Sequence, residues 1–109
     1  YFAATDFRAY DVAVTHASWT FSVDGTRCDV GRAHALMRGY AREVVLSGDE
    51  IAALPLLARG AALRFLLTRA HDWVHTPADA LVTRKDPAPF LNRLLRYRAA
   101  DAASLFATA

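Results

Sequence analysis

The sequence predicts a mainly α-helical chain of four to five helices in a single unit that spans residues 1–109. Apolar residues recur at spacings of three and four, which is the period of one face of a helix. Helix-capping signals precede three of the apolar runs, at Asp29, Ser47 and Asp86. No segment alternates apolar and polar residues as a half-buried strand would. These three observations together favour an all-helical architecture.

The first helix is expected over Phe7–Phe21, because apolar residues follow a helical stripe there. The stripe consists of Tyr10, Ala13, Val14, Ala17 and Phe21. Val12 and Trp19 widen it, so this helix should be buried on more than one side. Asp24-Gly25 then predicts a tight turn, because glycine adopts a positive φ without a steric cost.

Two further helices follow, each with its own N-cap. Asp29 is expected to cap a helix that runs from Val30 to about Val44. The segment from Ser47 to Glu50 fits a capping box, in which each side chain accepts a hydrogen bond from the other residue's amide. A third helix should therefore start there.

Proline residues mark the boundaries expected in the second half of the chain. Pro55 should either kink the third helix or end it after one short turn, because proline lacks an amide hydrogen. The longest apolar run, Leu56–Val74, predicts a central helix that ends at Thr76-Pro77. Asp86 is then expected to cap a last helix with Pro87 in its first turn. The apolar face of that helix should comprise Phe90, Leu91, Leu94, Leu95 and Tyr97.

Composition narrows the class of function. The 13 basic residues are scattered among 11 acidic ones, so no nucleic-acid partner is expected. No apolar run approaches the roughly 20 residues of a membrane span, so no membrane partner is expected either. Cys28 is the single cysteine, which favours a reduced, cytoplasmic setting. Apolar residues make up 54% of the chain, above the usual 45–50% or so, which indicates a surface that packs against a missing partner.

His71 and His75 lie four residues apart, with Asp72 beside the first, and this spacing resembles the His-Glu-x-x-His zinc motif. A catalytic zinc needs a third protein ligand, and the motif's general base is a glutamate with a longer side chain than aspartate. We therefore expect no metal site here. The two histidines should instead be exposed near a helix C-terminus, where positive charge is favoured.

Several other side chains have two interpretations. Asp11 is either an acid near a helix N-terminus, stabilised by the helix dipole, or a buried anchor for the amides of a neighbouring loop. Arg64 and Arg69 lie in the most apolar helix, where a charge must be paired, face a cleft or reach the surface. Surface exposure fits Arg69 better than Arg64. Trp19 and Trp73 are expected in the core.

The residues alone predict no active site. The chain contains no phosphate-binding glycine loop, no nucleophile with a base in place and no pair of catalytic carboxylates.

Short motifs nevertheless follow one another in a characteristic order along nearly the whole chain, to about Arg98. They are Tyr1-Phe2-Ala3, Ala9-Tyr10-Asp11-Val12-Ala13, Trp19, Asp24-Gly25, Arg38-Gly39-Tyr40, Leu54-Pro55, Ala62-Leu63-Arg64-Phe65-Leu66-Leu67-Thr68-Arg69, Asp72-Trp73 and Lys85-Asp86-Pro87. In this order and spacing the chain resembles the C-terminal third of bacterial homoserine kinases of the aminoglycoside-phosphotransferase-like type.

The resemblance implies the helical C-terminal lobe of a protein-kinase-like fold. Such enzymes transfer the γ-phosphoryl group of ATP, with Mg²⁺, to the side-chain hydroxyl of L-homoserine, a step in threonine biosynthesis. The family's catalytic and magnesium-binding aspartates would lie in the upstream part of the kinase. No catalytic residue and no metal ligand are therefore expected in this chain, and the fragment alone should be inactive.

The resemblance also implies roles for individual residues. Asp11 matches an acid that braces the catalytic loop, which favours its interpretation as a buried anchor. Trp19 and Arg64 would line the substrate side of the cleft, with Arg64 paired to the carboxylate of the amino acid. His16-Ala17-Ser18 departs from the Leu-Asn that often precedes the family's tryptophan.

Two alternatives therefore stay open. One is another small-molecule kinase of this fold, acting on choline, methylthioribose or an aminoglycoside. The other is a free-standing helical interaction module without catalysis.

Overall fold

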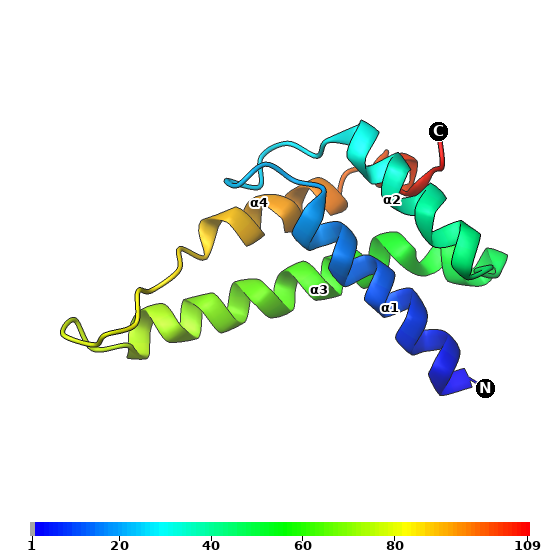
Figure 1. Cartoon of the computed structure of the whole chain (residues 1–109). Coiled ribbons are helices and arrows are strands. Elements are labelled where there is room, and N and C mark those ends of the chain that lie inside the picture. The colour runs from blue at the N-terminus through cyan, green and yellow to red at the C-terminus, as the bar shows by residue number, and fades with distance from the viewer. Residues whose placement is uncertain (1) are drawn as a thin grey trace.

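The computed structural model describes residues 2–109, with side chains from Arg8 onward; Tyr1, the first residue of the motif series, lies outside this range. The helices are α1 (Phe2–Trp19), α2 (Val30–Glu43), α3 (Gly48–His75), α4 (Ala88–Tyr97) and the short 3₁₀ helix η1 (Ala102–Phe106). The long helix α3 forms a spine that α1, α4 and η1 contact, while α2 packs against α1 and η1 (Figure 1). The prediction of a mainly α chain with four to five helices is thus confirmed for the described residues.

The predicted caps of α2 and α3 are confirmed. The Asp29 carboxylate accepts a hydrogen bond from the Arg32 amide at 2.9 Å, and α2 starts at the next residue. The Ser47 hydroxyl accepts from the Glu50 amide at 3.1 Å, while a Glu50 carboxylate oxygen accepts from the Ser47 amide at 2.9 Å. Each cap satisfies amides that the first helical turn leaves without partners.

Pro55 lies inside α3, so the alternative in which the helix ends there after one short turn is wrong. The helix runs as one continuous ribbon through this proline for 28 residues (Figure 1). Proline removes one amide hydrogen bond from the helix interior. Leu54 and Ala58, on either side of it, are both fully buried in the core, and this packing offsets the loss.

Helix α1 starts before the predicted Phe7 and ends at Trp19, two residues before the predicted Phe21. The residues that it buries are mostly small, as are those of α3, which lets the two helix backbones approach closely. They are Ala9, Val12, Ala13 and Ala17 on α1 and Ala58, Ala61 and Ala62 on α3. The expectation that Trp19 and Trp73 belong to the core is wrong, because their side chains are 69% and 42% exposed.

Helix α4 buries a different face from the predicted one. Phe90 and Tyr97 are buried as expected, but Leu91 and Leu95 are exposed and Arg93 is buried. The helix begins at Ala88, one residue later than predicted, and the Asp86 carboxylate accepts from the Ala88 amide at 2.9 Å.

His16 lies at the centre of the core and joins α1 to the C-terminal part of the chain. Its Nε2 donates to the Leu105 carbonyl at 2.9 Å, and its Nδ1 accepts from the Tyr97 hydroxyl at 2.6 Å. A carbonyl only accepts, so these partners assign the neutral tautomer with the proton on Nε2. The ring also stacks on Phe106, with centroids 4.2 Å apart. Burial lowers the pKa of His16 from 6.5 to about 4.

Arg93 is the second buried polar residue that links distant segments. Its Nε donates to the Ala17 carbonyl at 2.8 Å, its Nη1 to the Pro89 carbonyl at 2.9 Å and its Nη2 to the Ser22 carbonyl at 3.3 Å. The side chain therefore ties α4 to the end of α1 and to the turn that follows it. Gly25, in that turn, has a φ of +76° and lies against the Pro89 carbonyl.

The chain is more extended than a compact domain of its size. Its radius of gyration is 15.0 Å, against about 13 Å for a compact chain of this length. Its accessible surface is 7130 Å², against about 6,000 Å² for a folded monomer of 12.0 kDa. The excess includes exposed apolar side chains on α3, such as Leu56, Leu67 and Val74. This surface agrees with the expectation of a chain that packs against a partner.

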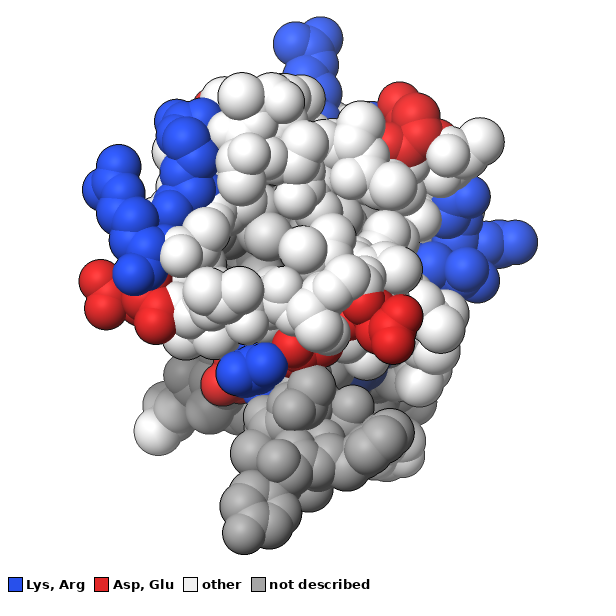
Figure 2. All heavy atoms as spheres, turned by 90° about the vertical axis from the view of Figure 1, so that its right-hand side faces the viewer, with Lys and Arg blue, Asp and Glu red and all other residues white. Residues whose placement is uncertain are grey.

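A second apolar surface lies where α2 ends and α3 begins. Figure 2 shows this face as mostly uncharged, with charged side chains along its edges. A groove of about 240 Å³ is lined there by Met37, Tyr40, Val44, Leu46, Ile51 and Phe106, among others.

Helix α3 is long and apolar enough to cross a membrane by length and composition, with a mean hydropathy of 1.5 over 18 residues. Uninterrupted apolar runs, on which the expectation of no membrane partner rests, do not reveal this segment. One such helix does not establish a membrane span. In this fold α1, α4 and η1 pack against it, although only 22% of the apolar stretch is buried.

We expect Gly25→Ala to lower the free energy of unfolding by about 3 kcal/mol, because the positive φ strains an alanine and its Cβ would lie on the Pro89 carbonyl oxygen. Gly39→Ala is the matched control: no atom outside its own helix lies within 4 Å, so alanine should stabilise α2 by roughly 0.5–1 kcal/mol. Urea denaturation of both variants measures these changes. Equal effects would contradict the assigned turn.

The buried neutral His16 should make the chain less stable in mild acid. Its pKa is about 4 when folded and 6.5 when unfolded, so between these values the unfolded state binds more protons. The contribution is present above pH 6.5 and falls with pH, which gives a loss of about 2 kcal/mol between about pH 7 and pH 5. Denaturation curves at both pH values test this. His71→Gln should keep the loss and His16→Gln should abolish it; the same loss in both would contradict the account.

Candidate functional site

A cavity of about 550 Å³ lies beside the segment 76–87. The second half of α3 forms one wall, the segment 76–87 the opposite one, and the start of α4 the floor, with the end of α1 at the rim. Its lining includes Phe65, Thr68, Arg69 and Asp72 of α3, Arg84 and Lys85 of the segment, and Phe90 and Arg93 of α4. Four of these eight side chains are basic and one is acidic.

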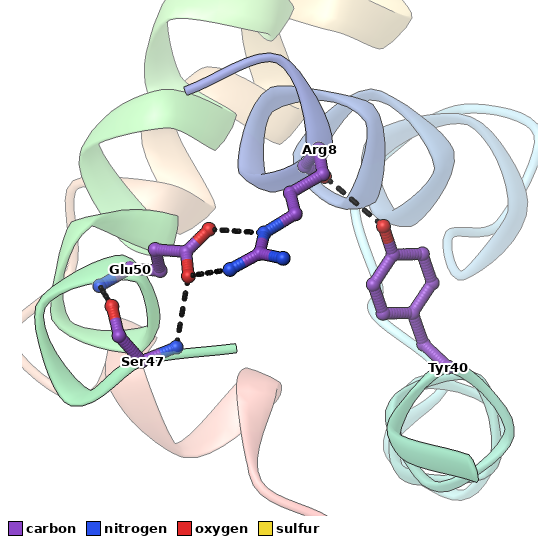
Figure 3. Close-up of polar contacts among 4 residues, drawn as sticks. All are labelled: Arg8, Tyr40, Ser47 and Glu50. Carbon is purple, nitrogen blue, oxygen red and sulfur yellow. Dashed lines mark hydrogen bonds and ion pairs between the residues drawn. The ribbon is translucent and has the colours of Figure 1, made fainter. Parts of the chain in front are cut away.

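An ion pair between α1 and α3 fixes the position of α1. Figure 3 shows the Arg8 guanidinium facing the Glu50 carboxylate, with Nε to Oε2 at 2.9 Å and Nη2 to Oε1 at 2.7 Å. The Glu50 carboxylate also accepts from the Ser47 amide, and the Tyr40 hydroxyl donates to the Arg8 carbonyl at 3.4 Å. The Arg8 guanidinium and the Ser47 amide lower the pKa of Glu50 to about 2. A bidentate pair of this kind holds two helices in register.

Asp11 lies one turn beyond Arg8, in the middle of α1. The helix starts at Phe2, so the interpretation of Asp11 as an acid near the helix N-terminus is wrong. Its side chain is exposed and makes no hydrogen bond or ion pair within the described part of the chain. Nothing in this part buries it, so any role as a buried anchor depends on another segment.

Trp19 and Arg64 lie on different parts of the surface, and the structure does not bring them together. Trp19 lines a shallow hollow between α1 and α2 with Arg32, whose Nη1 donates to the Trp19 carbonyl at 3.1 Å. Arg64 is exposed on α3, one turn before the cavity residue Thr68. Neither of the two is among the described residues that line the cavity.

The prediction that His71 and His75 are exposed near a helix C-terminus is confirmed. The rings of His71 and His75 are stacked, with centroids 4.1 Å apart, and both are exposed near the end of α3. His75 Nδ1 donates to the His71 carbonyl at 2.8 Å. Among the described residues no group of three or more His, Cys, Asp or Glu side chains could hold a metal ion. The described residues therefore do not fit a magnesium site.

Sequence reasoning missed Arg93 and His16. Arg93 lies in the amphipathic helix α4 beside Asn92, and only its partners on α1 and in the turn explain its burial. The family pattern marks His16 only as a departure and does not indicate that it is a core residue. The sequence offered one indication of this burial: His16 lies four residues from Thr20, beside a helical apolar stripe.

Curated proteins of known name match most of the chain. The homoserine kinase of Gluconacetobacter diazotrophicus is 55% identical over 100 residues, which are 92% of this chain and 31% of that protein. The homoserine kinase of Xanthobacter autotrophicus is 54% identical over 103 residues, 94% of this chain and 32% of that protein. The homoserine kinase of Rhizobium etli is 50% identical over 98 residues, 90% of this chain and 30% of that protein.

The chain is a homologue of part of the homoserine kinases. It spans about a third of the length of the curated relatives that it matches. No protein-family model matches it. The resemblance to homoserine kinases predicted from the ordered motifs is confirmed.

We expect Arg8→Ala to raise the pKa of Glu50 from about 2 towards its ordinary 4.5, because the bidentate partner is lost. Glu50 has a depressed pKa, so its contribution to stability is present above pH 4.5 and is lost as the pH falls towards 2. The destabilisation in Arg8→Ala should therefore be largest near neutral pH and shrink in acid. An NMR titration of the Glu50 side chain measures the pKa.

Arg59→Ala, at an exposed position of α3, is the control and should leave the Glu50 titration unchanged. A Glu50 pKa that stays near 2 in Arg8→Ala would show that the Ser47 amide alone holds the carboxylate.

Proposed function

We propose that this chain is the helical C-terminal lobe of a homoserine kinase with a protein-kinase-like fold. The observation that carries this proposal is the identity of 50–55% to homoserine kinases over at least 90% of the chain. The complete enzyme would transfer the γ-phosphoryl group of ATP to the hydroxyl of L-homoserine. ATP and Mg²⁺ would be bound by the upstream part of the protein.

The large exposed surface supports a lobe that packs against the rest of a longer protein. Apolar side chains on the outer face of α3 and in the groove between α2 and α3 are left uncovered. The matched part is 31% of the relative from Gluconacetobacter diazotrophicus, so the remainder of that protein is about twice as long as the matched part. Exposed apolar surface of this extent marks an interaction site.

In this proposal the chain positions groups and carries out no bond-breaking step. Asp11 braces the catalytic loop from below. Its exposed carboxylate accepts no hydrogen bond within the described residues and would accept hydrogen bonds from the backbone amides of that loop. Trp19 and Arg64, which lie outside the cavity, would contact the acceptor only where the upstream part of the enzyme completes the cleft. Such positioning converts two bound substrates into a nearly intramolecular pair, which lowers the entropic part of the barrier.

The test is an assay of the complete protein, expressed from its full coding sequence. Formation of O-phosphohomoserine that requires ATP, Mg²⁺ and L-homoserine together is the expected result. Activity on choline, methylthioribose or an aminoglycoside but not on homoserine would overturn the acceptor. Absence of phosphoryl transfer to all four would favour a non-catalytic helical module.

We expect Asp11→Ala in the complete enzyme to lower kcat roughly ten- to a hundredfold, because loss of the brace misplaces the catalytic loop. Asp49→Ala, another exposed acid in a helix, is the control and should keep the wild-type kcat. Steady-state kinetics of the two variants, with circular dichroism to show that both are folded, provide the measurement. An unchanged rate in Asp11→Ala would refute the bracing role.

A further inference from the structure

We propose that the cavity between α3, the segment 76–87 and α4 binds a small-molecule oxyanion, either the carboxylate of an amino acid or a phosphate group. The preference of this site for an oxyanion follows from its positive charges and its free N–H donors. The identity of the carboxylate source, L-homoserine, rests on the proposed function.

Two cations of the cavity wall share one aromatic ring. The guanidinium carbons of Arg69 and Arg93 lie 4.6 and 4.5 Å from the centre of the Phe90 ring. Neither forms an ion pair within the described part of the chain. Burial, together with the nearby charge of Arg69, lowers the pKa of Arg93. An anion that contacts both guanidinium groups would offset the unfavourable interaction between their charges.

Both guanidinium groups have N–H donors to spare. Arg93 uses three of its five N–H groups on backbone carbonyls, which leaves two. Arg69 uses one, from Nη1 to the Asp86 carbonyl at 3.0 Å, which leaves four. A carboxylate or phosphate accepts several such bonds at once, and charge-assisted bonds to arginine are among the strongest in proteins.

The opposite wall adds positive charge in a fixed position. The Arg84 guanidinium carbon lies 4.4 Å from the centre of the Trp73 ring, and its Nη1 donates to the Trp73 carbonyl at 2.9 Å. Lys85 is the fourth cation of the lining. Asp72 is the single acid among the described lining residues, and it lies beside His71 at 3.6 Å. The net charge of the cavity is therefore positive, which raises the local concentration of anions.

The size of the cavity suits a small molecule. About 550 Å³ lies within the range of roughly 300–1,000 Å³ that is usual for small-molecule sites. Phe65 and Phe90 provide apolar wall area next to the basic groups, so the ligand would present an anionic end and a short apolar or polar body.

The test measures binding of two probes, L-homoserine and inorganic phosphate, to the complete protein by isothermal titration calorimetry. Arg69→Gln and Arg84→Gln each remove one charge from a different wall, and neither side chain is buried in the core as Arg93 is. Arg59→Gln, exposed on α3 outside the cavity, is the control. Each cavity variant should raise the Kd of the bound probe about tenfold or more, and the control should keep it.

The two probes distinguish the source of the oxyanion. The carboxylate analogue test uses L-homoserine in which CH₂OH replaces the carboxylate. If L-homoserine binds the cavity variants more weakly and this analogue does not bind the wild-type protein, the site is assigned to the carboxylate. Weaker binding of phosphate alone assigns it to a phosphate group. If wild-type protein binds neither probe, or if both cavity variants bind them like wild type, the inference is overturned.

These outcomes separate the site from the proposed function. A protein without homoserine kinase activity that still binds phosphate through Arg69 would refute the function and keep the site. An active homoserine kinase whose affinity and KM are unchanged in both cavity variants would keep the function and refute the site.

Discussion

The buried guanidinium of Arg93 is the interaction on which the candidate site depends. It takes a charge out of water without an acidic partner in the described chain, which is costly unless hydrogen bonds replace the lost solvent. Carbonyls of α1, of the turn and of α4 supply these bonds, and the rings of Phe21 and Phe90 lie 5.5 and 4.5 Å from its guanidinium carbon. One side chain thus holds together the three segments that surround one end of the cavity.

The same end of α1 is held a second time by His16, which is bonded to residues 81 and 89 positions away along the chain. His16 and Ala17, whose carbonyl accepts from Arg93, are neighbouring residues of α1, while the Arg8–Glu50 pair ties α1 to α3 two turns earlier. Helix α1 is therefore anchored at Arg8 and again at His16 and Ala17. This anchoring matters for the proposed role, because a carboxylate such as that of Asp11 can brace a loop only from a support that does not move.

Local features of this fold were predictable from the sequence, and long-range ones were not. The caps at Asp29 and Ser47 depend on residues three positions apart, and both were predicted correctly. The burial of Arg93 and His16 depends on partners more than 70 positions away, which periodicity does not reveal. The helix continues through Pro55 because the neighbours of this proline pack in the core. Trp19 is exposed, and the sequence alone does not distinguish an exposed tryptophan at this position from a buried one.

For the candidate site, the motif order predicted the homoserine kinase relationship, yet the basic cavity came only from the structure. The sequence favoured a surface position for Arg69. Lys85 was identified only as part of the Lys85-Asp86-Pro87 motif. Their convergence requires the segment 76–87 to fold back along α3, which places Arg84 against Trp73. No spacing rule along the chain predicts such a return.

The most direct test of this account is a crystal structure of the complete protein with L-homoserine and a non-hydrolysable ATP analogue. We predict that the lobe packs through the exposed face of α3 or the groove beside α2, that Asp11 is buried against the catalytic loop, and that the acceptor carboxylate lies within hydrogen-bond distance of Arg69. An acceptor bound away from this cavity, with Asp11 still exposed to solvent, would contradict it.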